Sequence, residues 1–140
     1  LVQNFEIASI RKAVNDNVVT DIADINFNGV TLHNAIIDVE LVVSGDSGYC
    51  SRTEHRKFLF NRNPAGAGVA SSVELSGEEL SYSGSASYTV DAFTVSDTTS
   101  QYQVKVQALA DFGGGVGDSA GVISGTITVR SKDDFEVVRY

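Results

Sequence analysis

Residues 34–43 read NAIIDVELVV, and every odd position in this stretch is apolar. The even positions include Asp38 and Glu40, so polar and apolar side chains alternate. A period of two residues is typical of a β-strand that buries one face, whereas a helix would show a period of about 3.6 residues. Ile36 and Val42 are apolar exceptions on the polar side, which indicates that the second face of this strand is also partly covered.

The same alternation recurs in residues 101–108 and 123–129, and no stretch fits the helical period better. Runs rich in Gly, Ser, Asn and Asp, such as Ser76-Gly77, separate the apolar stretches at intervals of roughly 8–12 residues, as turns do in a sandwich or barrel. We expect nine strands, at residues 2–11, 18–27, 30–43, 49–60, 68–75, 85–95, 101–110, 121–130 and 135–139.

This pattern predicts an all-β fold without helices. The expected architecture is an antiparallel β-sandwich of about nine strands with a jelly-roll-like topology. No fixed repeat and no linker divides the sequence, so residues 1–140 are expected to form a single domain. The first residue is Leu1 rather than Met, and no signal-like stretch appears, so we expect a terminal piece or processed product of a longer protein.

The overall composition excludes several classes of partner. A formal charge of −8 disfavours binding to the phosphate backbone of nucleic acids. No apolar run approaches the roughly 20 residues that cross a bilayer, so membrane insertion is not expected. Cys50 is the sole cysteine of the sequence, which rules out an intrachain disulfide and a thiolate metal cluster. We predict no cofactor.

Two short motifs resemble the nucleophile sites of serine hydrolases. Residues 45–48 read GDSG and residues 117–121 read GDSAG. A serine nucleophile needs a histidine base held by an acid, and no histidine follows the second motif. Gly, Asp and Ser are also the residues that tight turns require. We therefore interpret both motifs as turns and expect no enzyme activity.

Metal chemistry has little support in the sequence. His33 and His55 are the only histidines, and a zinc site needs three or four donors in register. The loop aspartates, among them Asp16 and Asp46, do not match the spaced acidic pattern of a calcium loop. We predict no metal. A carboxylate pair for glycoside hydrolysis is defined by spatial and not sequential separation, so a carbohydrate-active enzyme stays open as an alternative.

Receptor-binding residues are expected in the Gly-rich loops. Loops on a stiff β-scaffold carry most binding sites, and exposed aromatic and acidic groups can stack on sugar rings or accept protons from sugar hydroxyls. The candidates are Asp46, Ser47, Tyr49, Asp111, Phe112, Asp118 and Ser119.

A basic stripe surrounds the apolar run of residues 58–60, and its members are Arg52, Arg56, Lys57 and Arg62. It is interpreted either as a solvated face paired with Asp38 and Glu40, or as an edge that docks an acidic partner such as a neighbouring subunit. Several strands are apolar on both sides, which favours self-association, because most soluble assemblies are symmetric homo-oligomers. The candidate interface residues are Arg52, Arg56, Lys57, Phe58 and Phe60.

Five segments resemble the C-terminal tip domain of bacteriophage tail fibres and tailspikes. They are residues 29–32 (GVTL), 44–49 (SGDSGY), 56–61 (RKFLFN), 85–90 (SASYTV) and 127–129 (ITV). The resemblance rests on strand rhythm and turn composition. It implies a trimer in the virion, whose exposed loops contact a host surface glycan or an outer-membrane protein.

Two other functions stay open, because β-sandwiches carry many unrelated activities. One is a purely structural virion protein, such as a capsid decoration or a spike. The other is an extracellular carbohydrate-binding module of a carbohydrate-active enzyme.

Overall fold

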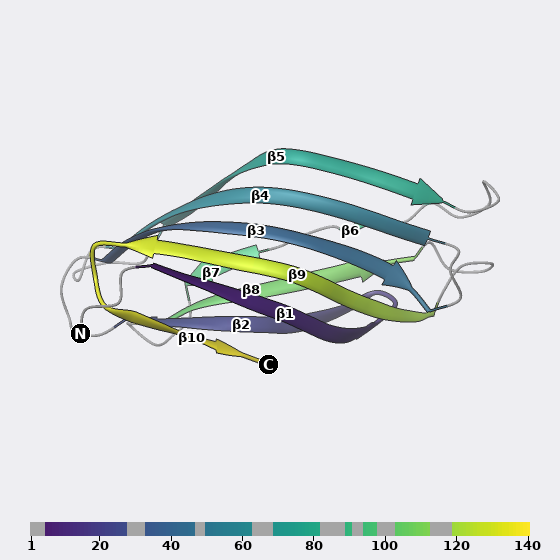
Figure 1. Cartoon of the computed structure of the whole chain (residues 1–140), viewed down its shortest axis with the longest axis horizontal. Helices are drawn as coiled ribbons and strands as arrows, with labels where there is room; N and C mark the ends of the chain where they lie inside the picture. The colour runs from purple at the N-terminus through teal and green to yellow at the C-terminus, as the bar shows by residue number, and fades with distance from the viewer. Residues whose placement is uncertain are drawn as a thin grey trace.

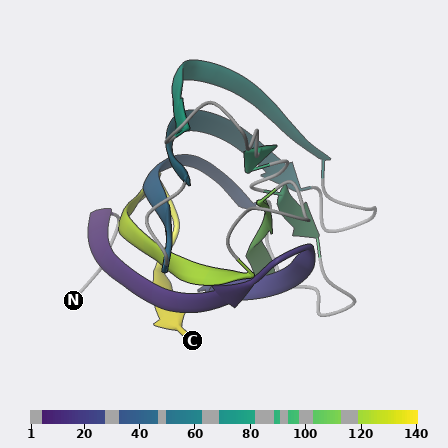
Figure 2. The same ribbon diagram turned by 90° about the vertical axis from the view of Figure 1, so that its right-hand side faces the viewer.

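The computed structural model describes residues 5–27, 33–46, 50–62, 69–81, 89–90, 94–97, 103–112 and 119–140. In this part of the chain all regular elements are β-strands, every pairing between them is antiparallel, and there is no helix. The strands form two sheets that face each other (Figures 1 and 2). The predicted all-β antiparallel class is therefore confirmed for the described residues.

Sheet A has the strand order β1-β9-β3-β4-β5. Its strands are β1 Phe5–Asn15, β9 Ala120–Ser131, β3 His33–Gly45, β4 Cys50–Arg62 and β5 Val69–Ser81. Sheet B has the order β10-β2-β8-β6, and β7 also pairs with β8. Its strands are β10 Phe135–Arg139, β2 Val18–Phe27, β8 Gln103–Asp111, β6 Thr89–Val90 and β7 Thr94–Asp97. The strands β3, β4 and β5 follow one another within a single sheet. The jelly-roll topology stays a prediction.

The number of strands differs from the expected nine. One strand was expected at residues 85–95, whereas the structure has the two short strands β6 and β7, which both pair with β8. The turn predicted at Ser76-Gly77 is also wrong, because β5 continues through it to Ser81. An irregularity in the β4–β5 register between His55 and Arg56 accommodates this segment without ending the ladder.

The hydrophobic core lies between the two sheets. The odd positions of β3 from Ala35 to Val43 are all buried and face side chains of β2 and β8. Phe60 of β4 stacks on Phe27 of β2 with ring centroids 6.1 Å apart, and Phe135 of β10 completes this aromatic group. The period-two pattern that predicted a strand thus also identifies the face that packs between the sheets.

A tight turn at Asp16 and Asn17 carries the chain from sheet A into sheet B. The Asp16 amide donates to the Ser119 carbonyl at 2.9 Å, and the Asn17 amide donates to the Ala110 carbonyl at 2.7 Å. The Asp16 carboxylate accepts a 2.7 Å hydrogen bond from the Phe112 amide. These bonds attach the turn to the end of β8 and the start of β9, so one end of the sandwich is held closed.

Candidate functional site

The outer face of sheet A carries large apolar side chains. Phe5, Ile7, Ile36, Val42 and Leu59 are between 37% and 58% exposed. Ile36, Val42 and Leu59 each lie between two buried neighbours on their strands. Ile36 and Val42 lie exposed on the outer face of β3, so the expectation that a second surface partly covers this face stays a prediction. An exposed apolar surface of this kind marks an interaction surface more often than a scattered single residue does.

On the outer face of sheet A, the neighbouring strands β1, β9, β3 and β4 together form one row of side chains across the sheet. Phe5 of β1 is opposite Arg130 of β9, Arg130 is opposite Ile36 of β3, and Ile36 is opposite Leu59 of β4. The row lines a groove of about 700 Å³. The other lining residues are Asn34, Ala35, Asn61, Ser131 and Lys132. We call this feature the sheet A groove.

Two cations line the sheet A groove, and each is paired with a carboxylate beside it. The Arg130 guanidinium lies 5.3 Å from the centroid of the Phe5 ring and donates to Asp38 Oδ2 at 3.0 Å. Lys132 Nζ pairs with Asp133 Oδ1 at 2.9 Å. Two cations and no carboxylate line the groove itself, among the residues the structure describes, whereas the whole chain has a formal charge of −8. The sheet A groove is therefore mainly apolar, and Asp38 and Asp133 balance the two positive charges at its edge.

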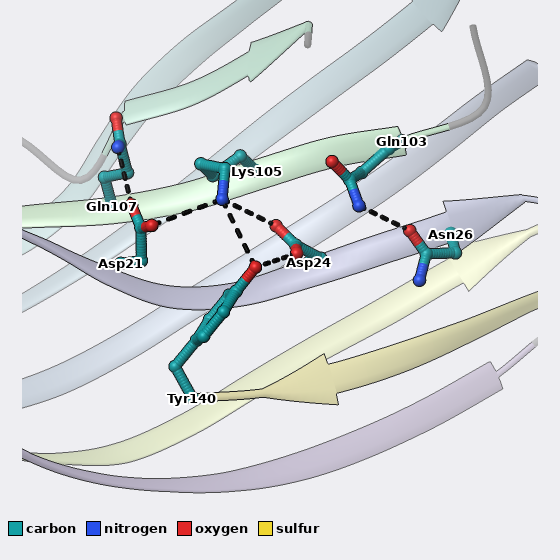
Figure 3. A network of polar contacts seen from close by, with 7 residues as sticks. All are labelled: Asp21, Asp24, Asn26, Gln103, Lys105, Gln107 and Tyr140. Atoms are coloured by element: carbon teal, nitrogen blue, oxygen red, sulfur yellow. Dashed lines mark hydrogen bonds and ion pairs between the residues drawn. The ribbon is translucent and has the colours of Figure 1, made fainter. Parts of the chain in front are cut away.

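The outer face of sheet B carries a polar network between β2 and β8. Asp21, Asp24 and Asn26 on β2 face Gln107, Lys105 and Gln103 on β8 (Figure 3). Gln107 Nε2 donates to Asp21 Oδ1 at 2.7 Å, and Gln103 Nε2 donates to Asn26 Oδ1 at 2.9 Å. Lys105 Nζ lies 3.2 Å from Asp24 Oδ1 and 3.3 Å from Asp21 Oδ2. Each rung of this ladder joins the two strands by a polar pair.

Tyr140 covers the middle of this network. Its hydroxyl donates to Asp24 Oδ2 and accepts from Lys105 Nζ, and its amide donates to the Ile22 carbonyl at 3.1 Å. The Lys105 ammonium lies 4.9 Å from the centroid of the Tyr140 ring. Because of this cover Asp24 is only 5% exposed, although it is on the outer face.

The protonation states of the network favour a structural role. The hydrogen bond from Gln107 lowers the pKa of Asp21. Desolvation by itself would lower the pKa of Lys105, but its bonds to Tyr140, Asp24 and Asp21 raise it. The hydrogen bond to Asp24 raises the pKa of Tyr140. Lys105 thus stays charged and Tyr140 stays protonated at neutral pH, the forms in which they make these bonds.

Part of the predicted receptor-binding set lies at the end of the sandwich that contains the Asp16 turn. Asp46 and Ser119 are exposed there, and the Asp46 amide donates to the Ala120 carbonyl at 2.9 Å. Asp111 is the last residue of β8. Phe112 was expected on an exposed loop, but its side chain is fully buried. Its ring packs against Gly121 so closely that a Cβ atom on Gly121 would be only 2.8 Å from Phe112 Cζ. Ser47, Tyr49 and Asp118 are outside the described residues.

The predicted interface residues of β4 divide between the two faces of sheet A. Phe58 and Phe60 are 4% and 1% exposed, because they share the inner face with their partners Ile37 and Ala35. They belong to the core and not to the surface. Lys57 is exposed on the outer face opposite Asp38.

Arg52 and Arg56 also lie on the inner side of β4. Arg52 Nη2 is 2.8 Å and Arg56 Nη2 is 3.3 Å from Oε1 of Glu54, which is 1% exposed. The interpretation of the basic stripe as one solvated face is therefore wrong. Its members alternate in direction along β4, as strand geometry requires.

The residues of the sheet A groove were not among the predicted site residues. Leu59 carried the signal, since it is apolar and lies between the two core residues Phe58 and Phe60. The contributions of Phe5 and Arg130 depend on strand pairings between distant parts of the chain.

The described part of the chain contains no cluster of three or more His, Cys, Asp or Glu side chains placed to hold a metal ion. It also contains no helix long and apolar enough to span a membrane.

No family model and no curated protein matches this chain. Two solved structures are similar to it. The tailspike protein of Acinetobacter baumannii phage AM24 has 12% sequence identity and a TM-score of 0.44, over 94% of this chain and 27% of the tailspike. The tailspike protein of Acinetobacter phage vB_ApiP_P1 has 10% identity and a TM-score of 0.43, over 96% of this chain and 22% of the tailspike. Both proteins are phage tailspikes, and this chain spans about a quarter of the length of each.

Proposed function

We propose that this chain is a non-enzymatic binding module of a bacteriophage virion, which recognises a host receptor at the tip of a tail fibre or spike and works there as a trimer. The observation that carries the assembly part is the apolar outer face of sheet A. A free two-layer sandwich normally presents polar side chains to water, so strands that are apolar on both faces are expected where a second surface covers them.

The free energy from burying the apolar outer face is too small by itself to hold copies of the chain together. Full burial of one Leu, Ile or Phe side chain contributes about 1.5–3 kcal/mol. Five side chains that are already half buried would contribute roughly 4–8 kcal/mol, whereas association costs about 4–15 kcal/mol. Covering this face therefore favours association, and polar complementarity has to supply the remainder.

The non-enzymatic part rests on the interpretation of the GDSG and GDSAG motifs as turns. The receptor-binding part is supported by the position of Asp46 and Ser119, which are exposed side by side at one end of a stiff sandwich. Carboxylates and hydroxyls in such a place suit a host surface glycan or a polar patch of an outer-membrane protein.

Light scattering tests the assembly part directly. We expect the mass of a trimer at micromolar concentration, and a monomer under these conditions would contradict the proposal.

A cell-binding assay separates receptor recognition from a purely structural role. The fluorescently labelled domain is expected to bind a subset of strains in a panel of Gram-negative bacteria. Asp46→Ala combined with Ser119→Ala should lower that binding, whereas Glu40→Ala, an exposed mid-strand control, should not. Failure to bind any strain as a trimer would favour the structural role.

A further inference from the structure

We propose that β10 is exchanged between copies of the chain, so that the β10 of one copy pairs with the β2 of the next. This inference rests on the self-association in the proposed function and adds the segment through which the copies are joined. β10 lies at the edge of sheet B, where it pairs with β2 alone among the described strands. It can therefore leave its place without breaking any other ladder.

Two contacts hold β10 in its place. At its start, Phe135 is 3% exposed, and its ring centroid lies 6.2 Å from that of Phe27. At its end, the Tyr140 hydroxyl bonds to Asp24 and Lys105 on β2 and β8 (Figure 3). Between these contacts β10 runs antiparallel to β2. The place that β10 fills thus matches this strand in side chains and in register, and a β10 from another copy would make the same contacts.

The connection between β9 and β10 decides between the two arrangements. When the same contacts form within one chain or between two chains, their free energies cancel, so only the connecting segment and the cost of association differ. Residues 132–134 form this connection, and they carry the chain from Ser131 in sheet A to Phe135 in sheet B. A short connection under strain favours exchange of the element that follows it.

Asp134 makes this connection unfavourable in the closed arrangement. Its Oδ1 atom is buried and accepts no hydrogen bond from any described residue. Its neighbour Asp133 is partly buried as well, so two carboxylates follow one another at the bend. A buried carboxylate oxygen without a partner is destabilising, because it has lost the hydrogen bonds that water provides. An extended connection would return Asp134 to water, so exchange would remove this destabilisation.

The connection also lies beside the proposed interface. Ser131 and Lys132, which lead into it, line the sheet A groove. A copy that covers the outer face of sheet A would thus lie next to the bend from which β10 passes across. Exchange places the polar contacts of Tyr140 between two copies, and such contacts are what the apolar face alone lacks. Each copy gives one β10 and accepts another, and three copies can close such a ring.

Disulfide cross-links distinguish exchange from association without exchange. Glu136 is directly opposite Asn26 on β2, and opposite residues of an antiparallel pair have Cα atoms about 4.5–5.5 Å apart, within the range that a disulfide spans. The test variant combines Asn26→Cys and Glu136→Cys with Cys50→Ser, because Cys50 is the sole cysteine of the sequence. The new disulfide joins two chains if β10 is exchanged, and lies within one chain if β10 stays.

The control combines Ser9→Cys and Thr126→Cys with the same Cys50→Ser change. Ser9 and Thr126 are opposite each other in the pairing of β1 with β9, which exchange of β10 leaves within one chain. Both variants are oxidised at micromolar concentration and separated on a denaturing gel without reductant. We expect covalently joined chains, up to three, from the test variant and single chains from the control.

Asp134→Ser provides a second test that leaves the contacts of β10 in place. It removes the unpaired carboxylate oxygen, so the closed arrangement should gain in stability relative to the exchanged one. In light scattering during dilution, this variant should dissociate to monomers at a higher protein concentration than the parent. Dissociation at the same concentration as the parent would contradict the role of the connection.

The gel and the mass together separate this inference from the proposed function. Single chains from a test variant that light scattering shows to be oligomeric would overturn the exchange alone. A monomeric parent would overturn the self-association in the proposed function as well.

Discussion

Gly125 of β9 is directly opposite Leu41 of β3, and a Cβ atom on Gly125 would stand 2.9 Å from the Leu41 Cα atom. The same Cβ would lie 2.1 Å from the Glu40 carbonyl oxygen, and Gly125 has a φ of +148°, which side chains rarely adopt. We expect Gly125→Ala to lower the free energy of unfolding by about 3–5 kcal/mol. Urea denaturation measures this, with Ser124→Ala as a neighbouring control that should change it by less than about 1 kcal/mol.

The face assignment of β3 can be tested at two adjacent positions. Leu41→Asp buries a carboxylate without a partner in the core, which costs several kcal/mol and should unfold the domain. Val42→Asp places the same group on the outer face, where Val42 is 39% exposed, and should keep the domain folded. Circular dichroism provides the measurement. Equal behaviour of the two variants would show that the register of β3 is wrong.

The basic residues of β4 should respond differently to reversal of their charge. Arg56→Glu would remove a cation from the buried carboxylate of Glu54 and place a second carboxylate beside it, so stability should fall by about 3–5 kcal/mol. Lys57→Glu changes an exposed charge opposite Asp38 and should cost no more than about 1 kcal/mol. Denaturant midpoints of the two variants compare these effects. A larger loss for Lys57→Glu would contradict the inward orientation of Arg56.

The network of Lys105 and Tyr140 predicts a loss of stability at alkaline pH. Both groups have a raised pKa in the folded state, so they bind their protons more tightly there than in the unfolded chain. Their contribution is complete below pH 10, near the ordinary values of 10.0 and 10.5, and is lost as the pH rises through the higher folded-state values. Tyr140→Phe removes the hydroxyl, so its melting temperature should be lower at pH 7 and should fall less steeply above pH 10. Parallel profiles for the parent and Tyr140→Phe would argue against this network.

The sequence predicts the parts of the fold that depend on local alternation. The inward face of residues 34–43 follows from the period of two, because a strand directs alternate side chains to opposite faces. The turn expected at Ser76-Gly77 does not form, because pairing with β4 extends the strand across residues that by themselves favour a turn. Long-range pairing thus overrides local preference at this position.

The candidate site was less accessible from the sequence, because it depends on the register between distant strands. Phe58, Leu59 and Phe60 are all apolar, and only the pairing of Phe60 with Ala35 shows which of the three face inward. Likewise, only the register of β4 shows that Arg52 and Arg56 share the inner side with the buried Glu54. Local patterns identified the doubly apolar strands, but they did not give the groove that these strands form together.

The row from Phe5 to Leu59 also bears on the order of events during folding. Its members come from positions 5, 36, 59 and 130, and the pairing of β1 with β9 joins nearly opposite parts of the chain. Contacts of such wide sequence separation form slowly, and domains generally fold as units. A polypeptide that has not yet placed β9 between β1 and β3 therefore has no complete groove to offer. Partly synthesised or misfolded chains would therefore lack the surface through which we propose that the copies associate.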